Sequence, residues 1–124
     1  VSYESAGLVV AGQRVTAIGG FSFNSVGAPP PAGYLVRVFN LPTDASCSIA
    51  ASDPKVVAQD QVMTDGFYFI WKKGSNQADV GAAELPGKVK YYLQLCNGTN
   101  PVVGHSLKDK LVEKEFDQED FVIP

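Results

Sequence analysis

The sequence predicts an all-β fold, an antiparallel β-sandwich, from three observations. Short apolar or alternating runs are separated by turn residues, which include many of the 12 glycines and 8 prolines. Asp65 and Gly66 form a turn signal that opens directly onto large apolar residues at positions 67–71. A second turn at residues 85–88 precedes an alternating strand at residues 89–95. We therefore expect these two strands to lie at the centre of the sandwich.

The length and composition indicate one folded domain spanning residues 1–124. A chain of 124 residues that is 45% hydrophobic and 19% charged buries a core of its own. No internal repeat, low-complexity tract or linker divides the chain. No apolar run approaches the ~20 residues of a membrane-spanning helix.

The N-terminal third is expected to contain short strands separated by glycine and proline. Residues 7–18 are typical of an opening strand or hairpin, which Gly19 and Gly20 would break. Residues 21–23 alternate as a half-buried strand. Residues 27–33 hold three prolines, which lack an N–H donor and fix φ. This segment is therefore predicted to be a stiff surface loop.

The middle of the chain is predicted to hold further strands and one long loop. Residues 40–54 are predicted to be a loop with at most one short strand at 48–50, and residues 56–63 a strand that leads into the Asp65 turn. Residues 34–39 are predicted to be a strand, with Tyr34, Val36 and Val38 on one face and Leu35, Arg37 and Phe39 on the other.

The C-terminal part changes character. Residues 72–83 are polar and small and predict a loop, and residues 97–101 consist of turn-forming types. Charges crowd residues 107–120, where a few apolar side chains at helical spacing allow a short C-terminal helix. Residues 121–123 are predicted to close the sheet as an edge strand that holds the terminus.

The two cysteines, Cys47 and Cys96, are predicted to form a disulfide. Each lies where a strand edge meets a loop, and their spacing matches no metal or redox motif. The bond would close a loop of about 50 residues, worth about 4 kcal/mol of stability. Two buried free thiols are the alternative. The disulfide would agree with export from the cytoplasm.

Charge is distributed unevenly, because residues 1–43 carry only three charged side chains. A sheet with one solvated face usually shows polar alternation on that face. Either the N-terminal strands are covered within the domain, or a permanent protein partner covers them. In the second case the predicted contact residues are Leu8, Val9, Val10, Ile18, Phe21 and Phe23.

Two turn–strand units resemble a known family. Residues 64–70 (Thr-Asp-Gly-Phe-Tyr-Phe-Ile) and 85–93 (Leu-Pro-Gly-Lys-Val-Lys-Tyr-Tyr-Leu) resemble the prealbumin-like sandwiches of collagen-adhesin B-type repeats and carboxypeptidase regulatory-like domains. The resemblance covers roughly residues 20–95 and implies an immunoglobulin-like or prealbumin-like sandwich. Adhesin repeats often carry a Lys–Asn isopeptide bond from an early strand. That bond is not expected here, because no lysine precedes Lys55.

In its general layout the chain also resembles the head-only subunit of the two-chain type IV pilins of some metal-reducing bacteria. In such pilins a short partner supplies the hydrophobic assembly helix, and a separate β-rich chain coats it. This resemblance implies that the partners are a short helical pilin and further copies of the chain itself.

Enzymatic chemistry is not expected. The single histidine, His105, adjoins Ser106, but a catalytic triad needs a base held within reach of an activated hydroxyl, which adjacent loop residues rarely provide. Structural zinc needs four Cys or His ligands, and the chain has three. A net charge of −3 argues against nucleic-acid binding. We predict no catalytic residue, resident metal or cofactor, although a calcium site at Asp44, Asp53 or Asp79 stays open.

The function predicted from the sequence is that of a non-enzymatic, exported structural subunit. It would assemble with partner chains into a bacterial surface filament of the type IV pilus kind, at the cell surface. The alternative is an adhesin stalk or carbohydrate-binding module that stacks sugars on Trp71 and Tyr92. Such aromatic residues more often serve as core or cross-strand pairs.

Overall fold

The computed structural model describes residues 2–4, 7–10, 13–15, 17–24, 26–77, 83–86, 89–102, 108–112 and 116–123. Within the described strands, the side chains before residue 17 and those of residues 108–112, 116 and 117 are not included. Apart from the short 3-10 turn η1 (Pro42–Asp44), the regular structure of the described residues consists of β-strands. The predicted all-β sandwich is confirmed.

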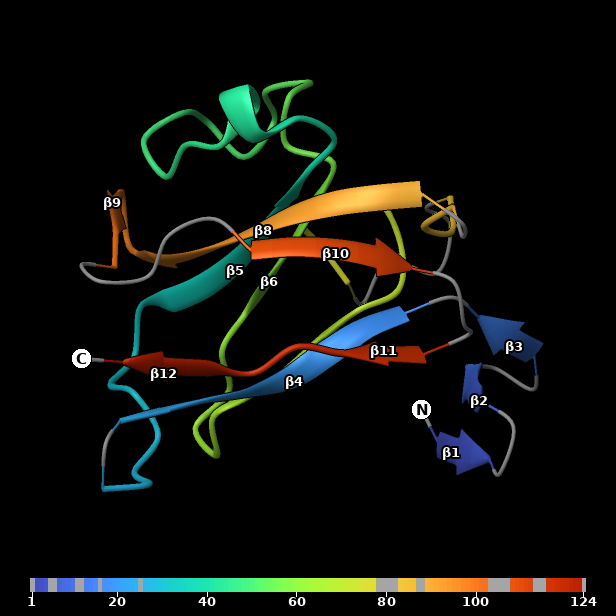
Figure 1. The fold of residues 1–124 in the computed structure, drawn as a ribbon, viewed down its shortest axis with the longest axis horizontal. Helices are drawn as coiled ribbons and strands as arrows, with labels where there is room; N and C mark the ends of the chain where they lie inside the picture. The colour runs from blue at the N-terminus through green and yellow to red at the C-terminus, as the bar shows by residue number, and fades with distance from the viewer. Residues whose placement is uncertain are drawn as a thin grey trace.

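The first sheet of the sandwich is antiparallel throughout. Its strand order is β10 (Lys108–Val112), β8 (Val89–Asn97), β5 (Tyr34–Phe39) and β6 (Ala58–Gln61), with the short β9 (Asn100–Pro101) paired to the end of β8. In Figure 1 these strands run together across the upper part of the molecule. The predicted strands at residues 34–39, 56–63 and 89–95 all lie here.

The second sheet is built around β4 (Ala17–Asn24). Strand β7 (Phe67–Ile70) pairs with β4 in antiparallel fashion. Two strands near the C-terminus, β11 (Phe116–Gln118) and β12 (Phe121–Ile123), pair in parallel with successive halves of β4, and Figure 1 draws them end to end along it. The predicted closing strand at residues 121–123 is thus confirmed as β12, and its partner is β4, with which it pairs in parallel.

A three-stranded antiparallel meander precedes β4. It consists of β1 (Ser2–Glu4), β2 (Gly7–Val10) and β3 (Gln13–Val15), with Leu8 opposite Val15. The hairpin predicted within residues 7–18 is therefore present as β2 and β3. It does not end at Gly19 and Gly20 as expected, because β4 starts at residue 17 and runs through both glycines.

The core lies between the two packed sheets. Alternation directs every second side chain of each strand inward, and full burial of a large apolar side chain stabilises the fold by about 1.5–3 kcal/mol. The main buried cluster draws on both sheets and comprises Ile18, Val36, Val38, Ala58, Tyr68, Ile70, Leu85, Tyr91, Leu93, Leu95, Val102 and Phe121.

The two strands predicted to be central do not pair with each other. Strand β7 belongs to the β4 sheet and β8 to the β5 sheet, and both contribute inward side chains to the one core. Both strands are therefore central to the core, as predicted. They pack against each other across the two sheets and do not pair side by side within one sheet. Local sequence carries no signal for which sheet a strand joins.

The short C-terminal helix that the sequence allowed is not formed by the described residues of this stretch. Residues 108–112 form β10 on the edge of β8, and residues 116–118 form β11 beside β4. Two or three apolar residues at helical spacing give weak local support, and pairing with an available sheet edge overrides such a preference. The short strand allowed at residues 48–50 is also absent, since that stretch consists of bends within the loop after η1.

The turn before β7 forms as predicted. The Asp65 side chain accepts a hydrogen bond from the Phe67 amide at 3.0 Å, which fixes the start of the strand. Gly66 has φ of 88°, and a Cβ atom there would lie 2.5 Å from the backbone oxygen of Ser22. Only glycine meets both conditions, so this turn docks tightly against β4.

Candidate interaction surfaces

The outer face of the β5–β8 sheet is covered by the molecule's own loop at residues 40–57. Arg37 points outward from β5 but is only 6% exposed. Its guanidinium donates to the Ser46 carbonyl at 3.1 Å, the Ile49 carbonyl at 2.8 Å and the Gln59 side chain at 2.9 Å. One side chain of the sheet thus holds the loop at two points, and we name this side of the sandwich the covered face.

The disulfide fixes the same loop to the next strand. Cys47 lies in the loop and Cys96 on β8, and their Cα atoms are 5.7 Å apart. Both cysteines are buried, and Phe39, on the same side of β5, is fully buried as well. The predicted disulfide is confirmed, and it indicates an oxidising location for the folded chain.

The outer face of the β4–β7 sheet carries aromatic side chains. Phe21 on β4 pairs across the strands with Phe67 on β7, with ring centroids 5.2 Å apart. Phe67 stacks on Phe69 at 6.3 Å, and Trp71 packs against the same cluster. Phe21 is 43% exposed, and Val122 on β12 is 48% exposed. We name this side, defined by Phe21, Phe67, Phe69, Trp71 and Val122, the open face.

Two adjacent glycines shape the open face. Gly19 lies opposite Phe69, so the strand offers no side chain there to compete with the ring for space. At Gly20 a Cβ atom would lie 2.2 Å from the backbone oxygen of Glu119, where the chain passes between β11 and β12. The chain therefore requires a glycine at position 20 for the close approach of its C-terminal segment.

The passage between β11 and β12 is held by polar contacts. The Asp120 carboxylate accepts a hydrogen bond from the Phe21 amide at 2.9 Å. From the core side, the Tyr68 hydroxyl donates to the Glu119 carbonyl. Burial, with the nearby carboxylates of Glu119 and Asp120, raises the pKa of Tyr68, so this phenol stays a neutral donor.

The edge of β7 away from β4 is capped by side chains. The Asp60 carboxylate accepts from the Phe69 amide at 2.9 Å, and the Gln77 side-chain oxygen accepts from the Trp71 amide at 3.1 Å and the Lys72 amide at 3.3 Å. Burial raises the pKa of Asp60, and the backbone hydrogen bonds oppose this shift. Donors satisfied in this way are less available to an added strand.

Lys72, just after β7, is fully buried. Among the described residues none accepts a hydrogen bond from its Nζ atom, which lies 4.2 Å from the centroid of the Trp71 ring. A buried ammonium without an acceptor carries a desolvation cost, and the ring face offsets part of it. The Trp71 ring therefore contributes to the local electrostatics as well as to the aromatic cluster.

The residues predicted to contact a partner lie in different parts of the structure. Ile18 is fully buried in the main core, so its assignment to a partner contact is corrected. Phe21 lies on the open face, and Phe23 is half-buried opposite Val122 in the register. Leu8, Val9 and Val10 lie on β2, and their side chains fall outside the described part of the chain.

The predicted sugar platform of Trp71 and Tyr92 is not assembled. Trp71 packs with the aromatic cluster of the open face. Tyr92 follows the inward-facing Tyr91 and pairs in register with Phe39, which places it on the side of the covered face. A sugar cannot stack on both rings at once, because the sandwich lies between them.

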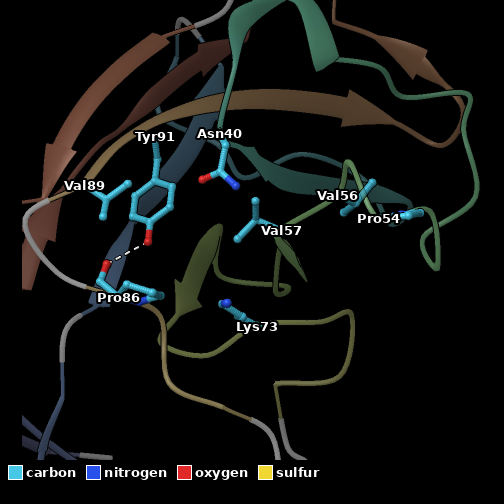
Figure 2. Close-up of a pocket in the computed structure, with 8 residues that line it drawn as sticks. All are labelled: Asn40, Pro54, Val56, Val57, Lys73, Pro86, Val89 and Tyr91. Atoms are coloured by element: carbon cyan, nitrogen blue, oxygen red, sulfur yellow. Dashed lines mark hydrogen bonds between the residues drawn. The ribbon is translucent and has the colours of Figure 1, made fainter.

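A small pocket lies at one end of the sandwich. Its volume is about 290 Å³, and it is lined by Asn40, Pro54, Val56, Val57, Lys73, Pro86, Val89 and Tyr91. Figure 2 shows Asn40 and Lys73 at different sides of this space, with Val57 between them and the Tyr91 ring beside it. The Tyr91 hydroxyl donates to the Pro86 carbonyl at 2.7 Å, and burial raises the pKa of Tyr91. Sequence reasoning missed this pocket.

No cluster of three or more metal-ligating side chains occurs among the described residues, which include Asp44 and Asp53 but not Asp79 or His105. In the same part of the chain, no helix is long and apolar enough to cross a membrane. No family model, no curated protein and no solved structure matches the chain.

Proposed function

We propose that the protein is a non-enzymatic, exported structural subunit that assembles with partner chains into a surface filament. The observation that carries this proposal is the open face, where Phe21 and Val122 expose about half of their surface beside the half-buried Phe67 and Trp71, with Phe69 buried beneath them. Contiguous exposed apolar patches of this kind mark interfaces between proteins.

The chemistry of the open face supports a permanent contact. The side chains that define it are aromatic or aliphatic, and the fully buried centres of stable interfaces are depleted in charge and enriched in aromatic residues. Phe67, Phe69 and Trp71 are already held against one another, so little side-chain freedom remains to be lost on binding. The disulfide fits an exported chain.

The proposed occupant is the hydrophobic helix of a short partner pilin, as in two-chain type IV pilins, with copies of the chain packed alongside. An apolar helix suits a sheet face because both elements bury one apolar side. We also propose a prealbumin-like relation for the sandwich. Its support is that the two turn–strand units of that resemblance coincide with the starts of β7 and β8.

The adhesin or carbohydrate-binding alternative has less support. The two aromatic residues assigned to a sugar platform lie on opposite faces, and the Trp71 ring already faces the Lys72 ammonium at 4.2 Å. A glycan array with wild-type protein tests this alternative independently of assembly.

The test removes the apolar surface without removing the fold. The double variant Phe21→Ser/Val122→Ser is expressed in the native host, and the chain is measured in the sheared surface fraction and in whole cells. A matched control, Leu41→Ser/Met63→Ser, removes two side chains that are 54% and 58% exposed and do not belong to the open face.

We expect wild type and control in the sheared fraction and the open-face variant only in whole cells, with all three proteins melting cooperatively. If the wild-type chain never appears in a surface filament, or if the open-face variant is incorporated as well as the control, the proposal is wrong.

A further inference from the structure

The end of the sandwich where β5 ends and β8 begins has a feature that assembly does not explain. Asn40 follows β5, Val57 precedes β6, Lys73 follows β7 and Val89 starts β8, so four strand ends converge on the pocket of about 290 Å³.

The pocket combines an apolar lining with two polar side chains, Asn40 and Lys73. Val56, Val57 and Val89 supply aliphatic surface, and the Tyr91 ring is fixed by its hydrogen bond to Pro86. A few polar groups above an apolar surface are typical of small-ligand sites.

The polar groups are the Asn40 amide and the Lys73 ammonium. Neither side chain makes a hydrogen bond or ion pair within the described part of the chain. Figure 2 shows Asn40 and Lys73 on either side of Val57. They are therefore available to a ligand.

The charge of the lining selects an anion. Among the described residues that line the pocket, Lys73 is the one cationic side chain, and none is an Asp or Glu. The Asn40 amide can donate a second hydrogen bond to the same ligand.

We propose that this pocket binds a carboxylate attached to a compact apolar body. Lys73 pairs with the carboxylate, Asn40 offers a hydrogen bond to the ligand from another side of the space, and Val57 and Val89 contact the apolar part. The ligand is either a small free acid or the C-terminal residue of a peptide, since both present this chemistry. The site does not rest on the proposed filament function, because none of the residues of the open face lines it.

The experiment is a titration of the disulfide-bonded, isotope-labelled chain followed by two-dimensional NMR. Three probes are compared: N-acetyl-phenylalanine, the same compound with its carboxylate converted to an amide, and a tetrapeptide ending in phenylalanine. The acid is expected to shift the backbone signals of Asn40, Val57 and Val89, and the amide to bind at least about tenfold more weakly because it lacks the charge-assisted bond.

The tetrapeptide distinguishes the two sources of the carboxylate. Affinity equal to that of the free acid assigns the site to a chain terminus, and exclusion of the peptide assigns it to a small acid. Failure of both the acid and the peptide to shift the three signals would overturn the proposal.

Variants locate the binding. Lys73→Gln is expected to weaken acid binding about tenfold or more and to leave amide binding unchanged. The control Lys90→Gln removes a lysine that lies over Tyr92 at 5.8 Å and does not line the pocket, and it should bind like wild type. Lys73 is exposed, so its replacement leaves the fold intact, as a melting curve verifies. Equal affinity of Lys73→Gln and wild type for the acid contradicts the assignment.

Discussion

The covered face and the open face belong to the same sandwich but differ in how far their outward side chains are exposed to solvent. On the covered face, the loop at residues 40–57 leaves Arg37 at 6% exposure and Phe39 at 0%. On the open face, Phe21 remains 43% exposed although its ring contacts Phe67. Phe39 is thus shielded within the chain on one side, and Phe21 is left accessible on the other.

This difference shows which contacts a chain needs in order to cover its own sheet with a loop. Ordering a long loop costs about 1–2 kcal/mol of backbone entropy per residue, so a covering loop needs strong anchors. On the covered face these anchors are a disulfide and two hydrogen bonds from Arg37 to the carbonyls of Ser46 and Ile49. On the open face, the Phe21 amide is satisfied by Asp120 from the same sheet and holds no covering loop.

The largest predicted effect comes from opening the covered face at its covalent anchor. The double variant Cys47→Ser/Cys96→Ser is expected to lose about 4 kcal/mol of unfolding free energy, because the bond closes a 49-residue separation in the unfolded chain. Denaturant unfolding of wild type with and without reductant measures the same loss, and the double variant must be insensitive to reductant. Unchanged unfolding of a fully reduced wild type would show that the loop is held by other contacts.

Removing the polar anchor is the next largest effect. Arg37→Met is expected to lower the unfolding free energy by about 2–3 kcal/mol, because the carbonyls of Ser46 and Ile49 lose a charged donor. Arg37→Lys serves as control and should recover part of the loss, since lysine restores the charge but not the planar fork. Accelerated hydrogen exchange confined to residues 46–49 in Arg37→Met would locate the effect, and its absence would argue against the anchor.

Strand positions were predictable because their signals are local. The alternation of residues 34–39 and the Asp65 turn each depend on a few neighbouring residues, and both appear as expected. The partition of strands between sheets and the parallel pairing of β4 with β12 depend on contacts about 100 residues apart in sequence, which leave no local pattern.

The candidate surfaces were predictable only in part for the same reason. The shortage of charge in the first 43 residues correctly drew attention to an apolar surface, and Phe21 is indeed exposed. Ile18, three positions earlier, is buried because an odd separation along a strand reverses the direction of a side chain. Asn40 and Lys73 lie 33 positions apart and match no spacing motif, so only the folded chain brings them together.

A smaller effect of opposite sign is expected at the rim of the open face. Lys72→Met should raise the unfolding free energy by about 1–2 kcal/mol, because it removes a buried ammonium to which no described residue offers an acceptor and keeps a long side chain that contacts the Trp71 ring. Chemical denaturation at neutral pH measures the gain. A loss of stability would mean that the contact between the ammonium and the ring exceeds the desolvation cost.

The smallest effect on stability is predicted on the open face itself. Phe21→Ser should lower the unfolding free energy by only about 1 kcal/mol, since much of the ring is already in water and the remaining loss is its contact with Phe67. The same substitution at Phe39, which is fully buried on the covered face, should be severely destabilising. Paired denaturant titrations compare the two variants directly.

If Phe21→Ser destabilised the isolated chain as much as Phe39→Ser, the chain itself would depend on Phe21, and the distinction between a covered and an open face would fail. If it leaves stability nearly unchanged and abolishes assembly, the contribution of Phe21 lies in contact with another chain.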